Sequence, residues 1–331
     1  KNNLFIDTYN SLAKIFFKDF YIVDQLSINT LYNSFKMKRV PLCINKYIVG
    51  KRFDKNKRKK IQIKIFSKDK FITSSIKELF NLLLPKSYFE NYHLLKKDLR
   101  LKNSTIISDG LHIHSDIVKI FIANFKKVKS NKYFILQHGG GYLCKYHSSH
   151  ELELKTSDVF YSWGKPIAKN EKQFNSPHIK NFVNISKLLD DKIIIPLYFP
   201  RKYTHNMTSI IGGKQYEENL SDLYIFLRNL NADILKKITL RLPPSGKHIL
   251  DFIKFIKNKF PNIIISHGKR SFKEDLKRYS LFVTNTYATT LLQASTSNIP
   301  MIFFWRKNHY RLNQKTDFIF NQLKKKKMFY H

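Results

Sequence analysis

The 331-residue chain predicts an α/β protein made of two Rossmann-like, doubly wound domains with a cleft between them. Short apolar runs alternate with amphipathic stretches of about ten residues, a pattern typical of parallel sheets covered by helices. This pattern occurs twice, with a polar, irregular stretch near residues 170–190 between the two series. The chain is also long enough to build two hydrophobic cores.

The first series covers residues 75–164. Strands are expected at 105–108, 133–136 and 159–161, and helices at 75–83 and 113–128. Ser75 and Glu78 have the spacing of a capping box, which places a helix start at Ser75. Because strand, helix and strand follow one another, the strands are expected to pair in parallel.

The second series covers residues 193–304. Strands are expected at 193–195, 238–242, 263–265, 281–283 and 301–304, and helices at 216–227, 249–256 and 287–297. Ser271 and Glu274 form a second capping-box pattern, which opens another short helix. We place the domain boundary in the polar stretch, giving domains 1–186 and 187–331.

The formal net charge is +36, and the lysines are spread along the chain with clusters at 55–60 and 324–327. Such a charge fits a polyanionic partner, either nucleic acid, an anionic membrane surface or phosphorylated substrates. A second origin is genome composition, because Lys, Asn, Ile, Phe and Tyr all have A/T-rich codons. We expect both origins to contribute, with the charge favouring anionic membranes or substrates.

Cys43 and Cys144 are the two cysteines, which is too few for a disulfide framework and fits a reducing, cytoplasmic compartment. The sequence has no apolar run long enough for a transmembrane helix and no visible signal peptide. The chain starts at Lys1 rather than Met, so an N-terminal portion is expected to be missing. We expect a cytoplasmic protein with peripheral contact at the inner face of the cell membrane.

A glycine-rich loop follows the strand at 133–136. Gln137 and His138 end the strand, and Gly139, Gly140 and Gly141 follow. Consecutive glycines permit backbone conformations and close approaches that other residues do not. Open α/β sheets bind ligands at such loops, beyond the carboxyl ends of their strands. The sequence therefore favours a binding loop over the alternative, a plain turn.

The segment 284–293, T-N-T-Y-A-T-T-L-L-Q, joins a strand to a helix. Thr286 is expected to cap the helix, and Thr289 and Thr290 add hydroxyl donors. The N–H groups of the first turn and the helix dipole suit a nucleotide phosphate without a metal. The alternative, an ordinary capped helix, remains open. Arg241 ends another strand and is a candidate phosphate partner, with a surface ion pair as its alternative.

Several other sites are disfavoured. The H-G-G-G run resembles an esterase oxyanion loop, but the chain has no G-x-S-x-G nucleophile elbow. Walker A and dinucleotide G-x-G-x-x-G patterns are also missing from the sequence. Cys144, His147 and His150 are spaced for metal contact but lack a clear fourth ligand, so no metal is expected.

Together the motifs QHGGGY, E-x-E, D-x-F-x-x-WG, T-x-TY-x-TT-L and NIP-x-IFFW resemble the LIC12162-type transferase family of bacterial surface-carbohydrate enzymes. The resemblance covers residues 134–164 and 193 to the C-terminus. It implies a GT-B-like architecture, with acceptor-side residues in 1–186 and a nucleotide-sugar donor bound in 187–331. The family is similar to capsule-type sugar transferases and to teichoic-acid glycerophosphotransferases.

The resemblance also assigns residues. The signature loop is matched by Gln137, His138, Gly139, Gly140 and Gly141, the acidic pair by Glu151 and Glu153, and the donor-side loop by Thr286, Tyr287, Thr289 and Thr290. Arg241 is a looser match. Gln293 stands where the family usually has a glutamate, a position at which GT-B enzymes hold the donor ribose. Leu143 stands where the family tends to have glycine.

The function implied is metal-independent transfer of a sugar from a nucleotide-activated donor, a CMP-linked sugar being one option, to a cell-surface glycan, lipid-linked or protein acceptor. The donor is a substrate, and no cofactor is expected. The base is His138, Glu151 or Glu153, and the sequence does not order them. Two alternatives stay open, a glycerophosphotransferase and a non-enzymatic polyanion-binding protein. Nucleic acid is not the expected partner, because no nucleic-acid-binding motif stands out.

Overall fold

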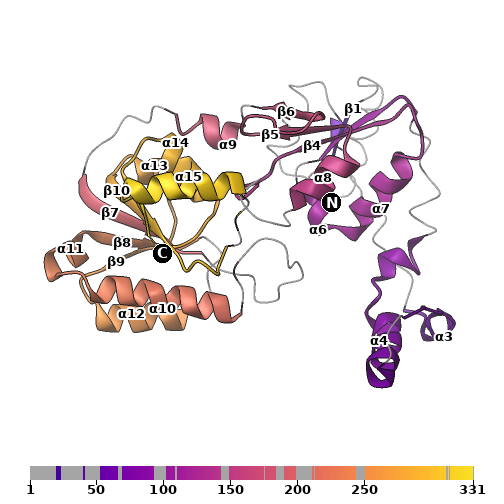
Figure 1. The fold of residues 1–331 in the computed structure, drawn as a ribbon, viewed down its shortest axis with the longest axis horizontal. Coiled ribbons are helices and arrows are strands. Elements are labelled where there is room, and N and C mark those ends of the chain that lie inside the picture. The colour runs from indigo at the N-terminus through magenta and orange to yellow at the C-terminus, as the bar shows by residue number, and fades with distance from the viewer. Residues whose placement is uncertain are drawn as a thin grey trace, which may run out of the picture. The chain divides into compact units, whose positions relative to one another are not determined.

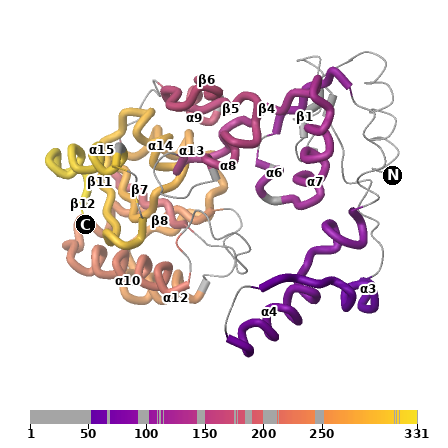
Figure 2. Tube along the Cα trace, turned by 45° about the vertical axis from the view of Figure 1, so that its right-hand side comes forward, coloured from indigo at the N-terminus to yellow at the C-terminus, as the bar shows by residue number. Residues whose placement is uncertain are grey.

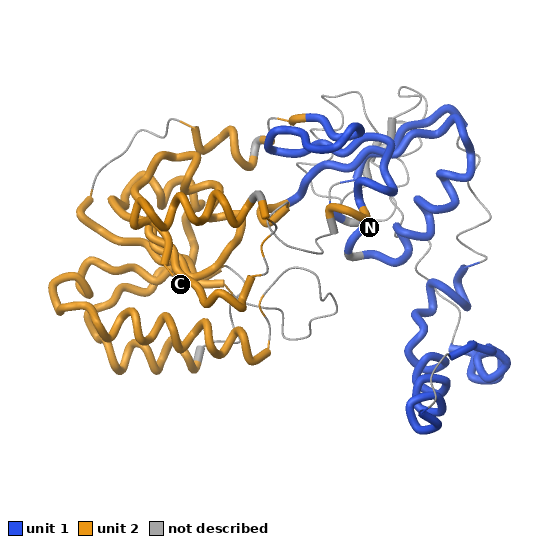
Figure 3. The backbone as a smooth tube through the Cα atoms, viewed as in Figure 1, with its two compact units in different colours: residues 1–138, 153–172 blue, residues 139–152, 173–331 orange. Residues whose placement is uncertain are grey.

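A computed structural model describes most of the chain. The described residues are 20–23, 40–41, 53–65, 69–92, 102–108, 110–142, 149–174, 176–183, 190–198, 211, 213–243, 250–310, 312 and 314–330. The chain forms two compact units, unit 1 of Lys1–His138 and Glu153–Lys172, and unit 2 of Gly139–Leu152 and Gln173–His331 (Figure 3). The chain therefore enters unit 2 between His138 and Gly139. The boundary after residue 186 stays a prediction, and 184–189 lie outside the described residues.

Unit 1 is built on a six-stranded sheet with the order β2-β1-β3-β4-β5-β6. The pairs from β2 to β5 are parallel (Figure 1). The three strands predicted in this half are confirmed as β3, β4 and β5, whereas β1, β2 and β6 were not predicted. The strands are β1 (Phe20–Val23), β2 (Val40–Pro41), β3 (Thr105–Ser108), β4 (Lys132–Leu136), β5 (Val159–Ser162) and β6 (Glu171–Gln173).

The helices of this half have local caps. Asp69 caps α4 by accepting the N–H of Ile72, so the helix start predicted at Ser75 was wrong, and Ser75 lies inside the helix. Ser115 caps α7, which buries Phe121 and Phe125. The helices are α3 (Lys55–Lys59), α4 (Lys70–Leu83), the 3₁₀ turn η2 (Lys86–Tyr88), α6 (Leu111–His114), α7 (Asp116–Phe125) and α8 (Ser149–Thr156), of which α8 belongs to both units.

Unit 2 has a second six-stranded sheet, with the order β12-β11-β10-β7-β8-β9 and parallel pairing throughout. Its predicted strands are all confirmed, and β12 was not predicted. The strands are β7 (Asp190–Pro196), β8 (Ile238–Arg241), β9 (Ile264–Ser266), β10 (Tyr279–Thr284), β11 (Met301–Phe304) and β12 (Phe329–Tyr330). The helices are α9 (Pro177–Lys180), α10 (Lys214–Arg228), α11 (Ala232–Lys237), α12 (Leu250–Lys259), α13 (Phe272–Leu276), α14 (Thr289–Thr296) and α15 (Gln314–Lys325).

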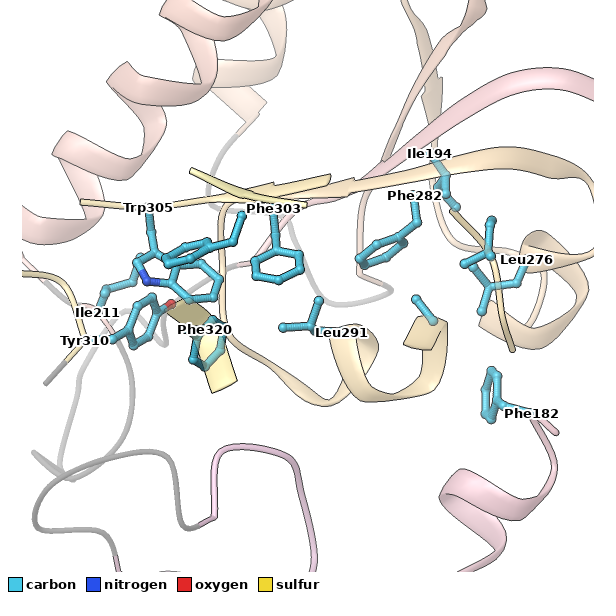
Figure 4. Close-up of a cluster of buried hydrophobic side chains, with 13 residues drawn as sticks. Phe182, Ile194, Ile211, Leu276, Phe282, Leu291, Phe303, Trp305, Tyr310 and Phe320 are labelled. Carbon is cyan, nitrogen blue, oxygen red and sulfur yellow. The ribbon is translucent and has the colours of Figure 1, made fainter. Parts of the chain in front are cut away.

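Helices cover both faces of the unit 2 sheet. Neighbouring residues of a strand point to opposite faces, and Ile194 and Ile195 accordingly belong to two different buried clusters. The Ile194 cluster includes residues of α13, α14 and α15 (Figure 4), and the Ile195 cluster includes residues of α10 and α12. The two latter helices run side by side in both views (Figures 1 and 2). The doubly wound α/β arrangement predicted from the sequence is thereby confirmed for unit 2.

The second predicted capping box is also confirmed. Ser271 accepts the N–H of Glu274, and the Glu274 carboxylate accepts the N–H of Ser271 at 2.9 Å. This box opens α13 directly before β10, the strand that leads into the second sequence motif.

Candidate functional site

The unit 2 sheet has the strand order of a nucleotide-binding fold. Numbered one to six along the chain, β7 to β12 have the spatial order 3-2-1-4-5-6, as in dinucleotide-binding Rossmann sheets. The order reverses between β7 and β10, which pair directly. Such sheets bind ligands beyond the carboxyl ends of their strands at this reversal point. The segment that leaves β10 here is the threonine-rich motif.

The loop that follows β10 is held by its own hydrogen bonds. The Thr284 hydroxyl oxygen accepts the N–H of Thr286 at 3.2 Å and lies 3.2 Å from the Thr286 hydroxyl. Asn285 and Asn219 each donate a side-chain amide to the other's backbone carbonyl, both at 2.8 Å. The three loop residues are buried. The loop is thus fixed before any ligand binds.

Helix α14 begins three residues later than Thr286, so the predicted cap at Thr286 was wrong. Its N-cap residue is Ala288, which provides no side-chain cap. The Thr286 hydroxyl is used inside the loop, and the N–H of Tyr287 donates to the Tyr310 hydroxyl at 3.0 Å. Burial raises the pKa of Tyr310, which keeps this hydroxyl protonated. A helix start without a side-chain cap suits an external acceptor such as a phosphate.

The glycine loop packs on the first turn of this helix. The N–H of Gly140 donates to Oγ1 of Thr289 at 2.9 Å. A Cβ atom on Gly140 would lie 3.0 Å from both N and Cα of Thr289. Gly141 has a φ of 94°, which is strained for any side chain. In contrast, a Cβ on Gly139 would meet only the Thr289 hydroxyl, at 3.5 Å. The structure therefore brings the two sequence motifs together within unit 2.

Two further predicted donor residues have partners inside the fold. The Gln293 side-chain amide donates to the carbonyl of His178 at 3.1 Å. The Arg241 guanidinium donates to the Asp275 carboxylate at 2.6 Å and to the carbonyl of Arg270 at 3.0 Å. The Arg241 and Asp275 side chains are only 12% and 6% exposed. This favours the ion-pair alternative for Arg241, although the pair is buried rather than at the surface.

Unit 1 contains a chain of three hydrogen-bonded side chains. Oγ of Ser108, at the end of β3, lies 2.8 Å from Nδ1 of His112, and Nε2 of His112 lies 2.7 Å from Oε1 of Glu153. An ionised carboxylate only accepts, so Nε2 carries the proton in this pair. Ser108 and Glu153 are buried, and the His112 side chain is 10% exposed. Glu153 is thus engaged in a buried pair.

An aromatic residue completes this buried group. The ring of Tyr133 meets that of His112 edge to face, with 6.4 Å between centroids. Burial raises the pKa of Tyr133, and the charge of Glu153 raises it further. The sequence interpretation missed Ser108 and His112. A polar residue at a strand end and a histidine four positions later were the available signal, but the link to Glu153 spans 41 residues.

Gln137 and His138 follow β4 and contact residues that follow β3 and β5 in unit 1. The ring of His138 packs on Gly110, which follows β3 with a φ of 85°, and a Cβ there would lie 3.3 Å from Cγ of His138. The Gln137 side-chain oxygen accepts the N–H of Trp163, after β5, at 2.8 Å. Gly110 is needed both for its backbone conformation and for the contact with His138.

The acidic pair lies on a helix, which the sequence interpretation did not predict. Residues of an α-helix are rotated by about 100° from one to the next, so positions two apart point in different directions. Glu153 is buried on α8 and Glu151 is exposed. Only Glu151 of the pair is therefore open to solvent. Thr290, at the start of α14, is half-buried.

The metal-ligand spacing noted in the sequence falls mostly outside the described residues, which exclude Cys144 and His147. His150 is buried and meets the ring of Tyr142 edge to face. Within the part of the chain that the structure describes, no group of three His, Cys, Asp or Glu side chains is placed to hold a metal ion.

A family model described as LIC12162 family transferase matches residues 2–331. The chain therefore belongs to the LIC12162 family, and its predicted enzyme class, transferase, is confirmed. No curated protein matches the chain. Among the described residues, no helix is long and apolar enough to cross a membrane.

Solved structures of trehalose-phosphate synthases share a distant likeness with the chain. A trehalose-6-phosphate synthase studied with bisubstrate glycomimetics is 9% identical, with a TM-score of 0.37, over 67% of this chain and 64% of that chain. The UDP-forming enzyme of Burkholderia xenovorans is 8% identical, with a TM-score of 0.37, over 67% and 65%. The Burkholderia multivorans enzyme is 9% identical, with a TM-score of 0.36, over 66% and 60%. The match thus spans less than two thirds of the length of these chains.

Proposed function

We propose that the protein is a metal-independent, GT-B-like glycosyltransferase. It moves a sugar from a nucleotide-activated donor to a cell-surface glycan, lipid-linked or protein acceptor. The observation that carries the proposal is the packing of Gly140 on Thr289 at the reversal point of the unit 2 sheet. Membership of a transferase family supports the reaction class.

The donor phosphate binds at the first turn of α14. The N–H groups of this turn and the helix dipole favour a negative charge there. The Thr289 hydroxyl accepts the N–H of Gly140, and its own O–H then donates to a phosphate oxygen. Thr290 adds a second hydroxyl. These donors stabilise the charge that develops on the phosphate as its bond to the sugar breaks.

The acceptor hydroxyl loses its proton to a base as its oxygen attacks the sugar. We assign this role to His138 or to the exposed carboxylate of Glu151. Glu153 is buried against His112 at 2.7 Å. It is therefore a positioning residue, which holds His112 and, through Ser108, the end of β3. Gly110 follows β3, and the ring of His138 packs on it.

Nucleotide binding tests the proposal. Thermal shift and ligand-observed NMR would be recorded with CMP, CDP, UDP, GDP and a short DNA duplex, at low and moderate salt. We expect one nucleotide to bind selectively, to tolerate salt, and to bind more weakly when Thr289 and Thr290 are changed to Val. Binding of DNA alone, abolished by salt as phosphate contacts are, would support a polyanion-binding protein instead. Binding followed by turnover of an activated glycerol donor would indicate a glycerophosphotransferase.

A further inference from the structure

Helix α4 of unit 1 has large apolar side chains that the described part of the chain leaves exposed. Its fourteen residues include none that is buried. Phe71 is 78% exposed, Leu83 73% and Leu79 51%, and the same surface continues over Ile72, Ile76, Phe80 and Leu82. Single exposed apolar residues are ordinary, but a continuous group on one short helix marks an interaction surface.

The helix is held firmly by a buried arginine of α3. Arg58 is 2% exposed, and its guanidinium binds the Glu90 carboxylate through Nε at 2.6 Å and through Nη2 at 2.7 Å. Its Nη1 donates to the carbonyls of Asn81 and Leu84, at the C-terminal end of α4, at 2.8 and 2.7 Å. The ring of Phe53 stacks on the guanidinium at 4.3 Å. The apolar surface therefore belongs to a fixed helix pair.

The surroundings of the helix are basic. Among the described acidic groups of residues 53–92, Asp54 and Asp69 cap α3 and α4 and Glu90 is paired with Arg58, whereas Glu78 on α4 is exposed. The exposed cations of this segment are Lys55, Lys57, Lys59, Lys60, Lys64, Lys70, Lys77 and Lys86. An apolar helix face on a lysine-rich segment complements a surface that is anionic outside and apolar beneath.

We propose that α4 is an interfacial helix that docks this protein onto an anionic lipid bilayer. A helix of fourteen residues is too short to span a bilayer, which takes about 20 residues. It can lie in the headgroup region, with Phe71, Leu79 and Leu83 inserted and the lysines at the phosphates. Nucleic acid would pair with the lysines but would not bury the apolar face of α4. This helix shares no residue with the proposed nucleotide site at α14.

Vesicle co-sedimentation of the full chain tests the docking. Vesicles of phosphatidylcholine alone would be compared with vesicles of equal parts phosphatidylcholine and phosphatidylglycerol. We expect binding to the anionic vesicles, and a decrease of about tenfold or more for Phe71→Ser and for Leu83→Ser, because each loses a large inserted side chain. Phe318→Ser on α15 is the matched control, since Phe318 is 64% exposed, and it should bind like the wild type.

A second pair of variants tests the charge. Lys57→Gln and Lys60→Gln should each weaken binding to the anionic vesicles by about fivefold, since a lysine near such a surface contributes about 1 kcal/mol. Thermal midpoints should stay unchanged in all five variants, because the substituted side chains are exposed. Nucleotide binding should also be unchanged, which separates this result from the test of the proposed function.

Three results would overturn the docking proposal. The first is equal loss of binding in Phe318→Ser and Phe71→Ser. The second is no preference for the anionic vesicles. The third is no vesicle binding together with a lower thermal midpoint of Phe71→Ser, which would mean that the chain itself covers this face.

Discussion

The backbone N–H of Gly140 donates a 2.9 Å hydrogen bond to Oγ1 of Thr289, although the two residues are 149 positions apart. One belongs to the glycine loop after β4 and the other to the first turn of α14. Their contact makes two separate sequence motifs a single feature of unit 2, at the place where a Rossmann sheet binds its ligand.

Gly140→Ala should abolish nucleotide binding. Its Cβ would lie 3.0 Å from backbone atoms of Thr289 and 3.2 Å from the carbonyl carbon of Ala288. Backbone cannot move aside as a flexible side chain can, so the loop must leave the helix. Overpacking of this kind costs about 1–3 kcal/mol. Calorimetric titration with the nucleotide selected in the panel measures the loss of binding, and urea unfolding measures the loss of stability.

Gly139→Ala is the control for the glycine loop. The new Cβ would meet only the Thr289 hydroxyl, at 3.5 Å, which is ordinary van der Waals contact. Affinity and stability should therefore stay near wild type. If both alanine variants behaved alike, the contact with α14 would not be what the loop requires.

Thr289→Val should weaken nucleotide binding and destabilise the protein by about 1 kcal/mol. Valine has nearly the same shape as threonine but cannot accept the N–H of Gly140. Thr289→Ser keeps the hydroxyl and should restore most of both properties. Equal affinities of Thr289→Val, Thr289→Ser and wild type in the same titration would show that the Thr289 hydroxyl does not contribute to nucleotide binding.

Glu153→Ala should destabilise the protein by about 1–3 kcal/mol, because it removes the 2.7 Å partner of Nε2 of His112 in a buried position. Glu151→Ala changes an exposed residue of the same helix and should stay within about 0.5 kcal/mol of wild type. Chemical denaturation of the two variants makes the comparison. Similar stabilities would argue against a structural pairing of Glu153 with His112.

Turnover measurements distinguish a positioning role of Glu153 from a role as the general base. Glu153→Gln keeps a hydrogen-bonding side chain beside His112, so the pH profile of kcat should retain its shape with a modest loss of rate. Removing a true general base costs about 10²–10⁴-fold, and one of His138→Ala and Glu151→Ala should do so. A loss of that size in Glu153→Gln, with the fall of kcat at acidic pH gone, would make Glu153 the base.

Acid should loosen the α3–α4 pair. The Arg58 guanidinium holds the pKa of Glu90 at about 2, below its ordinary value of 4.5, and burial opposes this effect. A lowered pKa stabilises the fold above pH 4.5, and this contribution is lost as the pH falls towards about 2. The shift corresponds to at most about 3 kcal/mol. Amide exchange protection of α3 and α4, corrected for intrinsic rates, should fall in this window.

Glu90→Gln is the matched variant for the acid prediction. It lacks the titrating group, so its protection should be lower than wild type above pH 4.5, and the two proteins should converge near pH 2. A constant difference across this range would show that the Arg58–Glu90 pair does not carry the pH dependence.

Local patterns predicted much of the fold. The strands at 105–108 and 301–304 and the box at Ser271–Glu274 were predicted correctly, because periodicity and capping depend on neighbours in sequence. The same box pattern failed at Ser75, because the helix already begins at its cap residue Asp69, six positions earlier. The pattern alone does not exclude an earlier start. The strands that were not predicted, β1, β2, β6 and β12, have only two to four residues, which is too few to show a periodicity.

The candidate site was less predictable, because its contacts are long-range. Thr286 has a good cap residue type, but Thr284 takes its hydroxyl, and Tyr310 takes the next N–H. Arg241 has a side chain suited to a phosphate, but its guanidinium pairs with Asp275, which lies 34 residues away in sequence. The glycine loop and the threonine motif were both recognised in sequence, whereas their direct packing required the structure.

Nucleotide affinity of Gly140→Ala against Gly139→Ala tests the central claim most directly. The account predicts that wild type and Gly139→Ala bind the same nucleotide with similar affinity, and that Gly140→Ala does not bind it while remaining folded. Wild-type affinity in folded Gly140→Ala would contradict the assignment of the donor site to the contact between the glycine loop and α14.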